Sequence, residues 1–451
     1  MKIKNIFFFI VFFLPFVYSL VVNVKVPLKT YEMLFVLFLL FWFMRGAVAG
    51  EIKLRIDRAF YPLLFFFLWV VFTVIISYVG LLSFESMPNW SATRGSFLLN
   101  PIIEIFYLLL NILLAIFVSN LIVSKASLKN IYGIMIFSSI LVCLYGLQLF
   151  LGALLKVPAL VLPTMSEKPP VSFFFIPRVT ATFKEPNFFA GYMTALIPIG
   201  LAFFFAPKTK IRSFLNKKAI VILILGLQLL TLILSMSTGG VISFLASGGF
   251  FFLLLFLRFK NKRAKLLVFI GALLVASYLF IQAVGLGDAF NQVVFEKLFG
   301  GEISSVTHSR DERLEQINGA LTLFAQNPVF GIGLSNFGLY FDQVLGISYG
   351  FEASANNIYV ELLAETGLIG LILFAWFFIV LFKKFFQTYR KAGSNEEAIL
   401  LIGSWSSLVA ILTTWNFFPS YSMSFFWVMF GVFIGYLNKL EKNEEIDENR
   451  L

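Results

Sequence analysis

Three arginines in two polar stretches of an otherwise apolar chain are the residues best suited to do chemistry: Arg178, Arg310 and Arg313. A planar guanidinium group binds phosphate oxygens through paired hydrogen bonds and stays protonated at any working pH. Such groups contribute roughly 3–4 kcal/mol each when negative charge develops beside them in a water-poor site. We therefore expect them to bind a phosphate-like anion. The alternative is that they anchor lipid headgroups or solvate a loop.

The two polar stretches, residues 154–186 and 286–366, must position these side chains. In the longer stretch, Ser309 and Glu312 have the spacing of a capping box, which predicts the start of a helix. An apolar face at helical spacing follows, formed by Leu314, Ile317, Leu321 and Phe324. Asn327-Pro328 predicts the end of the helix, because the residue before proline avoids helical geometry. The longer stretch should therefore be partly helical.

The remainder of the chain has the composition of a membrane protein, with 59% hydrophobic and 13% charged residues. Apolar runs long enough to cross a hydrocarbon core of about 30 Å recur throughout. We predict twelve spans, at about 6–22, 31–49, 60–80, 102–122, 131–153, 188–206, 219–236, 241–257, 266–285, 367–382, 398–415 and 422–437. Because backbone amides find no water in lipid, the spans should be helices. The predicted fold class is an all-α integral membrane protein, residues 1–451 forming a single polytopic domain.

The net charge of +11 follows the expected membrane orientation. If the amino terminus is inside, the inner segments carry 25 of the 35 Lys and Arg residues and the outer segments carry 10. This positive-inside bias predicts that both termini are cytoplasmic. It places loops 154–186 and 286–366, with the three arginines, on the outer side of the membrane. The basic excess is thereby explained without a nucleic-acid partner.

Sulfur and imidazole groups are scarce. Cys143 is the only cysteine and lies within a predicted span, which excludes a disulfide framework and a thiolate metal site. His308 is the only histidine, and no cluster of carboxylates or histidines suggests a metal ion. We expect no cofactor. The first segment, Lys2 to Val22, has the charge pattern of a secretory signal but lacks a small-residue cleavage site, so we expect it to remain as a helix.

Three motifs occur in order around the arginines. They are Arg178-Val-Thr-Ala-Thr-Phe-Lys-Glu-Pro-Asn187; then Arg313 followed by Asn327-Pro328, Gly331-Ile-Gly333 and Asn336-Phe337; and last Ala355-Asn-Asn-Ile-Tyr-Val-Glu-Leu-Leu-Ala-Glu-Thr-Gly-Leu-Ile-Gly370. Together they resemble the O-antigen ligase and O-antigen polymerase superfamily of membrane glycosyltransferases. The twelve-span layout, with its largest outer loop between the ninth and tenth spans, is similar to that family as well.

This resemblance implies a GT-C-like enzyme that moves a glycan from an undecaprenyl-diphosphate-linked oligosaccharide to an acceptor hydroxyl. The reaction would need no metal and would take place at the outer face of the bacterial inner membrane. The expected partners are the polyprenyl-diphosphate-linked donor, a glycan or lipid acceptor, the bilayer and, for a polymerase, a chain-length regulator protein.

The chain departs from the family pattern in two places. Asn356 stands where most members have a histidine that is thought to orient or deprotonate the acceptor hydroxyl. An amide can hydrogen-bond a hydroxyl but cannot take its proton. Either arginine binding and positioning suffice, because a diphosphate leaves well, or another group such as His308 or Glu361 substitutes as the base. In addition, Ser237-Thr-Gly-Gly240 stands where many relatives have Ser-Arg-Gly, which removes one phosphate-facing cation.

On this basis we assign catalysis to Arg178, Arg313, Asn356, Glu361 and His308. Binding of the diphosphate or glycan is assigned to Arg178, Arg310, Arg313, Lys184, Asn187, Asn336, Asn357 and Tyr359. The missing histidine favours a polymerase over a ligase, which would transfer to a lipid core or a protein. A transporter of lipid-linked oligosaccharides is the alternative from another class. Related halves and polar residues near the midplane, which transporters commonly show, are not found in the sequence.

Overall fold

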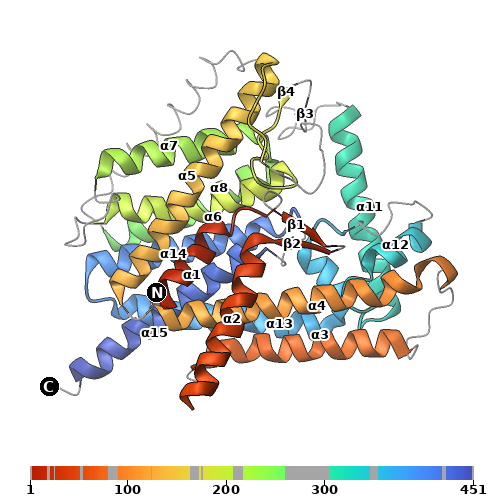
Figure 1. Cartoon of the computed structure of the whole chain (residues 1–451), viewed down its shortest axis with the longest axis horizontal. Coiled ribbons are helices and arrows are strands. Elements are labelled where there is room, and N and C mark those ends of the chain that lie inside the picture. The colour runs from red at the N-terminus through yellow and green to blue at the C-terminus, as the bar shows by residue number, and fades with distance from the viewer. Residues whose placement is uncertain are drawn as a thin grey trace.

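The computed structural model of the chain describes residues 3–17, 21–24, 26–50, 54–79, 90–122, 124–162, 172–173, 176–206, 217–259, 304–345, 354–418 and 423–448, which are almost all helical (Figure 1). The helices are α1 Ile3–Phe13, α2 Thr30–Ala49, α3 Tyr61–Val79, α4 Trp90–Leu121, α5 Lys125–Leu155, α6 Pro186–Phe205, α7 Lys218–Leu234, α8 Thr238–Arg258, α11 Ser304–Gln326, α12 Phe337–Leu345, α13 Ile358–Lys391, α14 Asn395–Thr414 and α15 Ser424–Glu448. Two short antiparallel hairpins pair β1 Val21–Val24 with β2 Val26–Lys29 and β3 Ser172–Phe173 with β4 Ile176–Pro177. The prediction of an all-α integral membrane protein is confirmed.

Within these residues, eight helices are long and apolar enough to cross a membrane: α2, α3, α4, α5, α6, α8, α13 and α14. Each matches one of the twelve predicted spans. The seventh predicted span corresponds to the shorter helix α7 and the twelfth to the apolar first part of α15. The ninth, 266–285, lies outside the described residues. The number of spans beyond these eight therefore stays a prediction.

The prediction for the first span, 6–22, is wrong. Helix α1 has only 11 residues, and at 1.5 Å per residue it extends roughly 16 Å, about half of a hydrocarbon core. Pro15 follows the helix, and the valine-rich segment after it pairs as the β1–β2 hairpin. Proline and β-branched residues disfavour a continuing helix, whereas apolarity alone does not distinguish the two outcomes.

Helices α6 and α14 form the centre of the bundle. In their apolar windows 83% and 78% of the residues are buried, against 28–50% for the other candidate spans. Both helices pack on each other and on α8. Outside this centre, α15 packs closely on α4, because Gly431 and Gly435 leave no room for side chains. An added Cβ there would lie 2.3 Å from the Ala115 carbonyl oxygen and 2.6 Å from that of Ser119.

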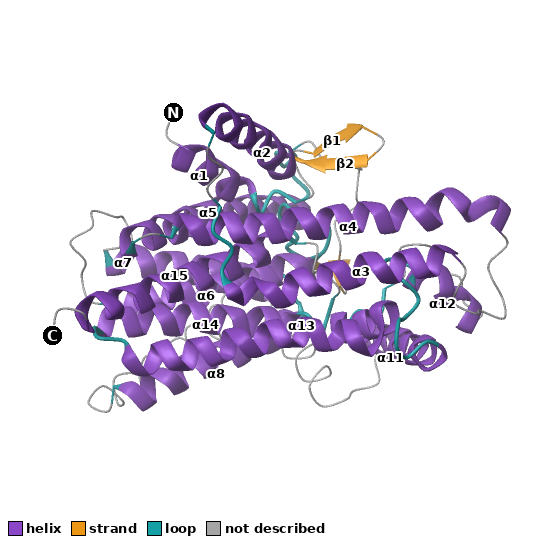
Figure 2. Cartoon of the chain, turned by 90° about the horizontal axis from the view of Figure 1, so that it is seen from below, coloured by secondary structure: helices purple, strands orange, loops and turns teal. Residues whose placement is uncertain are grey.

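Two helices from the long polar stretch gather at one end of the bundle. Helix α11 runs across the direction of α3, α4 and α13 instead of along it, and α12 lies beside it (Figures 1 and 2). With the start of α13 they enclose a small core of their own, formed by Ala320, Leu323, Ile332, Phe337, Tyr340, Phe341, Ala355 and Ala364. We call this end, which also carries Arg178, the arginine end.

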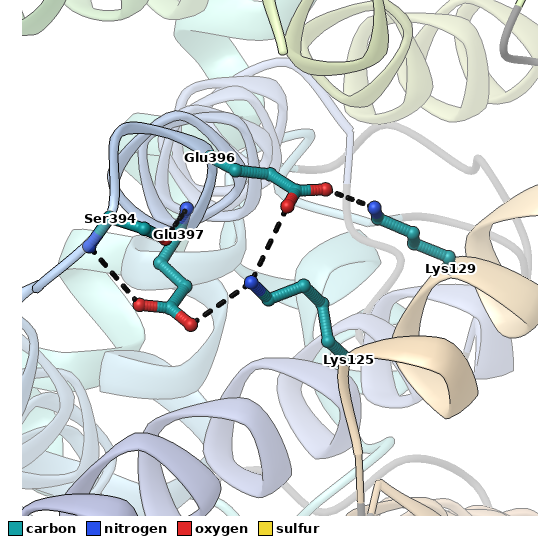
Figure 3. A network of polar contacts seen from close by, with 5 residues as sticks. All are labelled: Lys125, Lys129, Ser394, Glu396 and Glu397. Atoms are coloured by element: carbon teal, nitrogen blue, oxygen red, sulfur yellow. Dashed lines mark hydrogen bonds and ion pairs between the residues drawn. The ribbon is translucent and has the colours of Figure 1, made fainter. Parts of the chain in front are cut away.

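The opposite end of the bundle, the lysine end, is held by an ion-pair network between the starts of α5 and α14 (Figure 3). Lys125 contacts Glu397 at 3.0 Å and Glu396 at 3.4 Å, and Lys129 contacts Glu396. Ser394 and Glu397 form a capping box at the start of α14. Each charge in this network thus has an opposite charge within the protein.

Candidate active site

Arg178, between the β3–β4 hairpin and α6, fastens its loop to the turn that joins α7 to α8. Its Nε donates to the carbonyl oxygen of Ser235 at 2.9 Å, and its Nη2 donates to that of Met236 at 3.2 Å. The amide of Val179 donates to the carbonyl of Leu234 at 3.1 Å. A guanidinium has five N–H donors, so three of them have no acceptor among the described residues.

Two helices begin next to this turn. Ser237 caps α8, its Oγ accepting from the amide of Gly240 at 3.1 Å. The same hydroxyl donates to Oδ1 of Asn187, in the first turn of α6, at 2.7 Å. Helix starts carry unpaired amides and a partial positive charge. The segment that departs from the family's Ser-Arg-Gly pattern is thus a helix start joined to the start of α6.

Arg313 comes from α11 and shares an acidic neighbour with Arg178, namely Glu185, the residue before α6. Burial lowers the pKa of Arg178 to about 10; the carboxylate of Glu185 opposes this, and the charge of Arg313 adds to it. Burial also lowers the pKa of Arg313, against the opposing effect of Glu185 and Glu312. Both groups are cations at neutral pH.

The two arginines are therefore brought into electrostatic reach of each other from separate segments. Among the residues that the structure describes, neither forms an ion pair with a carboxylate. Both half-buried cations lie under the influence of Glu185, and Arg313 also under that of Glu312, but the absence of an ion pair leaves guanidinium N–H groups available to a ligand. Such an arrangement favours binding of an anion.

Gln316, three residues after Arg313 on the same side of α11, connects this helix to Asn356. The Nδ2 of Asn356 donates to Oε1 of Gln316, which is buried. Asn356 has a φ of 50°, in the left-handed region that asparagine tolerates better than most residues. The residue that replaces the family's histidine is thus held against the helix that carries Arg313.

A break in α13 gives the arginine end its shape. Gly367 has φ 68° and ψ −175° inside the helix, and a Cβ there would lie 2.1 Å from the carbonyl oxygen of Val329. Into this break the turn 328–333 inserts. The amides of Ile332 and Gly333 donate to the carbonyls of Ala364 and Glu365 at 2.9 and 2.8 Å. The Gly331-Ile-Gly333 motif therefore packs directly against the break at Gly367 of the third motif.

A family model described as O-antigen ligase matches residues 219–375. This region of the chain is therefore similar to the O-antigen ligase family. A search of curated proteins found none that matches the chain. The matched region runs from α7 into α13 and includes Arg313, Gln316 and Asn356, whereas Arg178 precedes it. The resemblance to the O-antigen ligase and polymerase superfamily is confirmed for this part of the chain.

Two carboxylates lie on the first part of α13, within the region that matches the O-antigen ligase family. Oε2 of Glu361 accepts from the amide of Ala355 at 2.7 Å, and Oε1 of Glu365 accepts from the amide of Phe337 at 3.1 Å. Both residues are buried, with 8% and 2% of their surface exposed. Glu361 braces the residue before Asn356, and Glu365 holds the start of α12. A role for Glu361 as a base stays a prediction.

Several predicted binding residues of the matched region serve the fold. Asn357 caps α13, its Oδ1 accepting from the amides of Tyr359 and Val360 at 3.0 and 3.2 Å. The hydroxyl of Tyr359 donates to the carbonyl of Leu412 at 2.7 Å. Nδ2 of Asn336 donates to the carbonyl of Ile332 at 2.9 Å and approaches the Ser77 hydroxyl at 3.4 Å. Their contacts with a substrate stay predictions.

The structure gives less detail for the remaining predicted site residues. Lys184 is half-buried beside Glu185. His308 and Arg310 lie on the first turns of α11, and their side chains are outside the described residues. The capping box is wrong as a helix start, because α11 begins at Ser304 and Ser309 lies within it. Its predicted end is correct, at Gln326.

Gln316 was not among the predicted site residues, although its spacing from Arg313 places both on one helix face. The influence of Glu185 on both arginines had no signal in the sequence, because it depends on how α11 and the start of α6 lie relative to each other. Among the described residues no group of three or more His, Cys, Asp or Glu side chains could hold a metal ion.

Proposed function

We propose that the protein transfers a glycan from a polyprenyl-diphosphate carrier to an acceptor hydroxyl, and that Arg178 and Arg313 hold the diphosphate between them. The observation that carries this proposal is the pair of guanidinium groups, from separate segments, that lie within electrostatic reach of each other, with N–H donors of Arg178 left without an acceptor among the described residues. The matched O-antigen ligase family supports this reaction class.

The reaction requires positive charge beside the departing diphosphate. The bond between the anomeric carbon and the diphosphate oxygen breaks, and its electron pair leaves with the diphosphate. The acceptor oxygen bonds to the same carbon and loses its proton. Arginines that hold the leaving oxygens stabilise the charge that develops there. The starts of α6 and α8, joined through Asn187 and Ser237, add oriented amides beside Arg178.

On this proposal the acceptor hydroxyl approaches Asn356, which Gln316 orients from the Arg313 helix. An amide can position a hydroxyl but cannot accept its proton. Glu361, five residues further along the chain, is our candidate for the base. Because a diphosphate leaves readily, positioning and arginine binding would supply the larger part of the rate enhancement, and a base roughly 10²–10⁴-fold.

We further propose that the acceptor is a second lipid-linked glycan, which makes the protein a polymerase of a surface polysaccharide such as O-antigen. Asn356 in place of histidine is the feature that favours a polymerase over a ligase. The positive-inside pattern of the segments after the first predicted span supports a location in the inner membrane with the carboxyl terminus cytoplasmic and the arginine end outside.

The test is reconstitution of the purified protein in liposomes with an undecaprenyl-diphosphate-linked repeat unit. A polymerase should yield a ladder of longer glycans without nucleotide sugar or ATP. Addition of lipid A core should leave the ladder unchanged. Transfer of single glycans to that core would instead identify a ligase. Movement of intact carrier between leaflets, with no new glycosidic bond, would identify a transporter and refute the proposal.

A further inference from the structure

The surface of α11 between Glu312 and Gln326 divides into three strips. One faces the protein and is formed by Gln316, Gly319, Ala320 and Leu323, all buried. A second strip is polar and is formed by Glu315, Asn318, Thr322 and Gln326. The third, which we call the apolar flank, is formed by Leu314, Ile317, Leu321 and Phe324. This is the amphipathic face that the sequence predicts.

The described residues leave much of the apolar flank uncovered. Leu314 is 47% exposed and Leu321 is 44% exposed, and Val329, just after the helix, is 46% exposed. The face that α11 buries is instead made of small and polar residues together with Leu323. A helix in water would place its apolar face inward. The reversed arrangement indicates that something apolar outside the described residues covers the flank.

The position of the flank shows what covers it. Pro328, at the end of α11, accepts through its carbonyl from the amide of Leu368 at 2.9 Å. Leu368 and Ile372 lie on the membrane-spanning helix α13 and are 49% and 56% exposed. The flank therefore joins, through Val329, the outward side of a helix that faces lipid. Helix α11 also runs across the spanning helices and not along them (Figures 1 and 2).

We propose that α11 lies in the plane of the bilayer surface, with its apolar flank in the boundary between acyl chains and headgroups and its polar strip in water. In-plane amphipathic helices bind membranes in this way. The occupant of the flank is the outer leaflet of the surrounding bilayer, because the flank is continuous with the lipid-facing side of α13.

This position has a consequence for Arg313. On the helix it lies one turn before both Gln316, on the buried face, and Ile317, on the apolar flank. Its guanidinium is therefore at the edge between protein and lipid, at headgroup depth. A diphosphate carried by a membrane-embedded lipid would reach that depth without leaving the bilayer. The inference about α11 does not depend on the reaction, however, and its test is independent of activity.

The test uses single cysteines carrying a nitroxide spin label, in full-length protein in liposomes and in a Cys143→Ser background. The positions compared are Leu314→Cys and Leu321→Cys on the apolar flank, Asn318→Cys and Thr322→Cys on the polar strip, and Ile372→Cys as the lipid-facing reference. Each is measured for collision with oxygen, which concentrates in lipid, and with a water-soluble nickel chelate. Elution as a single peak and an unchanged melting temperature confirm that each variant is folded.

We expect the oxygen-to-nickel ratio at Leu314 and Leu321 to match that of Ile372 and to exceed that of Thr322 severalfold. Leu321 and Thr322 are adjacent in sequence and both exposed, so they form a matched pair. A ratio at Leu321 equal to that at Thr322 would place the flank in water and overturn the proposal. Poor access of both reagents to the flank would do the same, because another protein surface would then cover it.

Discussion

The two ends of the bundle use charge in opposite ways. At the lysine end, Lys125 and Lys129 face Glu396 and Glu397, and each cation contacts a carboxylate (Figure 3). At the arginine end, Arg178 and Arg313 share the influence of Glu185, and neither forms an ion pair among the described residues. The first arrangement is complete without a ligand, and the second is not.

This difference distinguishes charges that stabilise the fold from charges that are available to bind a substrate. Leaving a buried charge unpaired costs free energy, so a structural network tends to neutralise itself. A site for a diphosphate must keep its cations available, and the cost is recovered when the anion binds. Helix starts follow the same rule. At the lysine end Glu397 completes the cap of α14, whereas at the arginine end neutral side chains cap α8 and α13.

The largest effect is expected from Arg178→Ala, because Arg178 both binds carbonyls and supplies charge. Loss of its bonds to Ser235 and Met236 should destabilise the protein by about 2–3 kcal/mol, and transfer should fall by at least about 10²-fold. Arg178→Lys keeps the charge but cannot hold both carbonyls, so it should recover part of the activity. Thermal unfolding and the glycan ladder are measured on the same preparations. Wild-type transfer by Arg178→Ala would remove this residue from the mechanism.

Arg313→Ala should separate the effect on transfer from the effect on stability. The guanidinium of Arg313 makes no hydrogen bond within the described part of the chain, so its removal should change the melting temperature little. Transfer should nevertheless fall by roughly 10²–10³-fold, because a cation beside the leaving diphosphate is lost. Glu315→Ala, on the polar strip of the same helix, is the matched control and should retain activity. A large drop in stability for Arg313→Ala would show that this end is structural as well.

A substitution at the lysine end should give the reverse result. Glu396→Gln removes the carboxylate beside Lys129, which is 5% exposed, and leaves its ammonium group without a carboxylate. We expect a loss of about 2 kcal/mol in the free energy of unfolding, with the rate of transfer per folded molecule unchanged. Glu397→Gln affects the more exposed Lys125 and should cost less than about 1 kcal/mol. Loss of transfer in Glu396→Gln without unfolding would contradict the separation between the ends.

Much of this architecture could be predicted from the sequence, because lipid solvation acts on composition. Eight predicted spans recur as helices of membrane-crossing length, and the end of α11 at Asn327-Pro328 was predictable from proline sterics. The first span was not, since 6–22 is apolar throughout and only its proline and valines indicate a short helix and a hairpin.

The site itself was predictable as a set of residue types but not as a set of contacts. Arg178 and Arg313 were identified from their chemistry, whereas their common neighbour Glu185 and the bond between Gln316 and Asn356 depend on how distant segments pack. The apolar face of α11 was identified correctly, but what covers this face could not be predicted. Periodicity shows that a helix has an apolar side and does not show whether protein or lipid covers it.

The smallest effect is expected from Asn356→His, which restores the family's residue beside Gln316. If position 356 faces the acceptor, an imidazole there can both orient the hydroxyl and take its proton, so the rate should be equal to wild type or higher. The base must be neutral, and the gain should therefore appear only as pH rises through roughly 6.5, the ordinary pKa of histidine. Transfer is measured from pH 5.5 to 8.5 for Asn356→His, Asn356→Gln and wild type. Asn356→Gln keeps an amide and should show no new pH dependence. A loss of activity in Asn356→His at every pH, with the fold intact, would mean that Asn356 positions α11 through Gln316 and does not meet the acceptor.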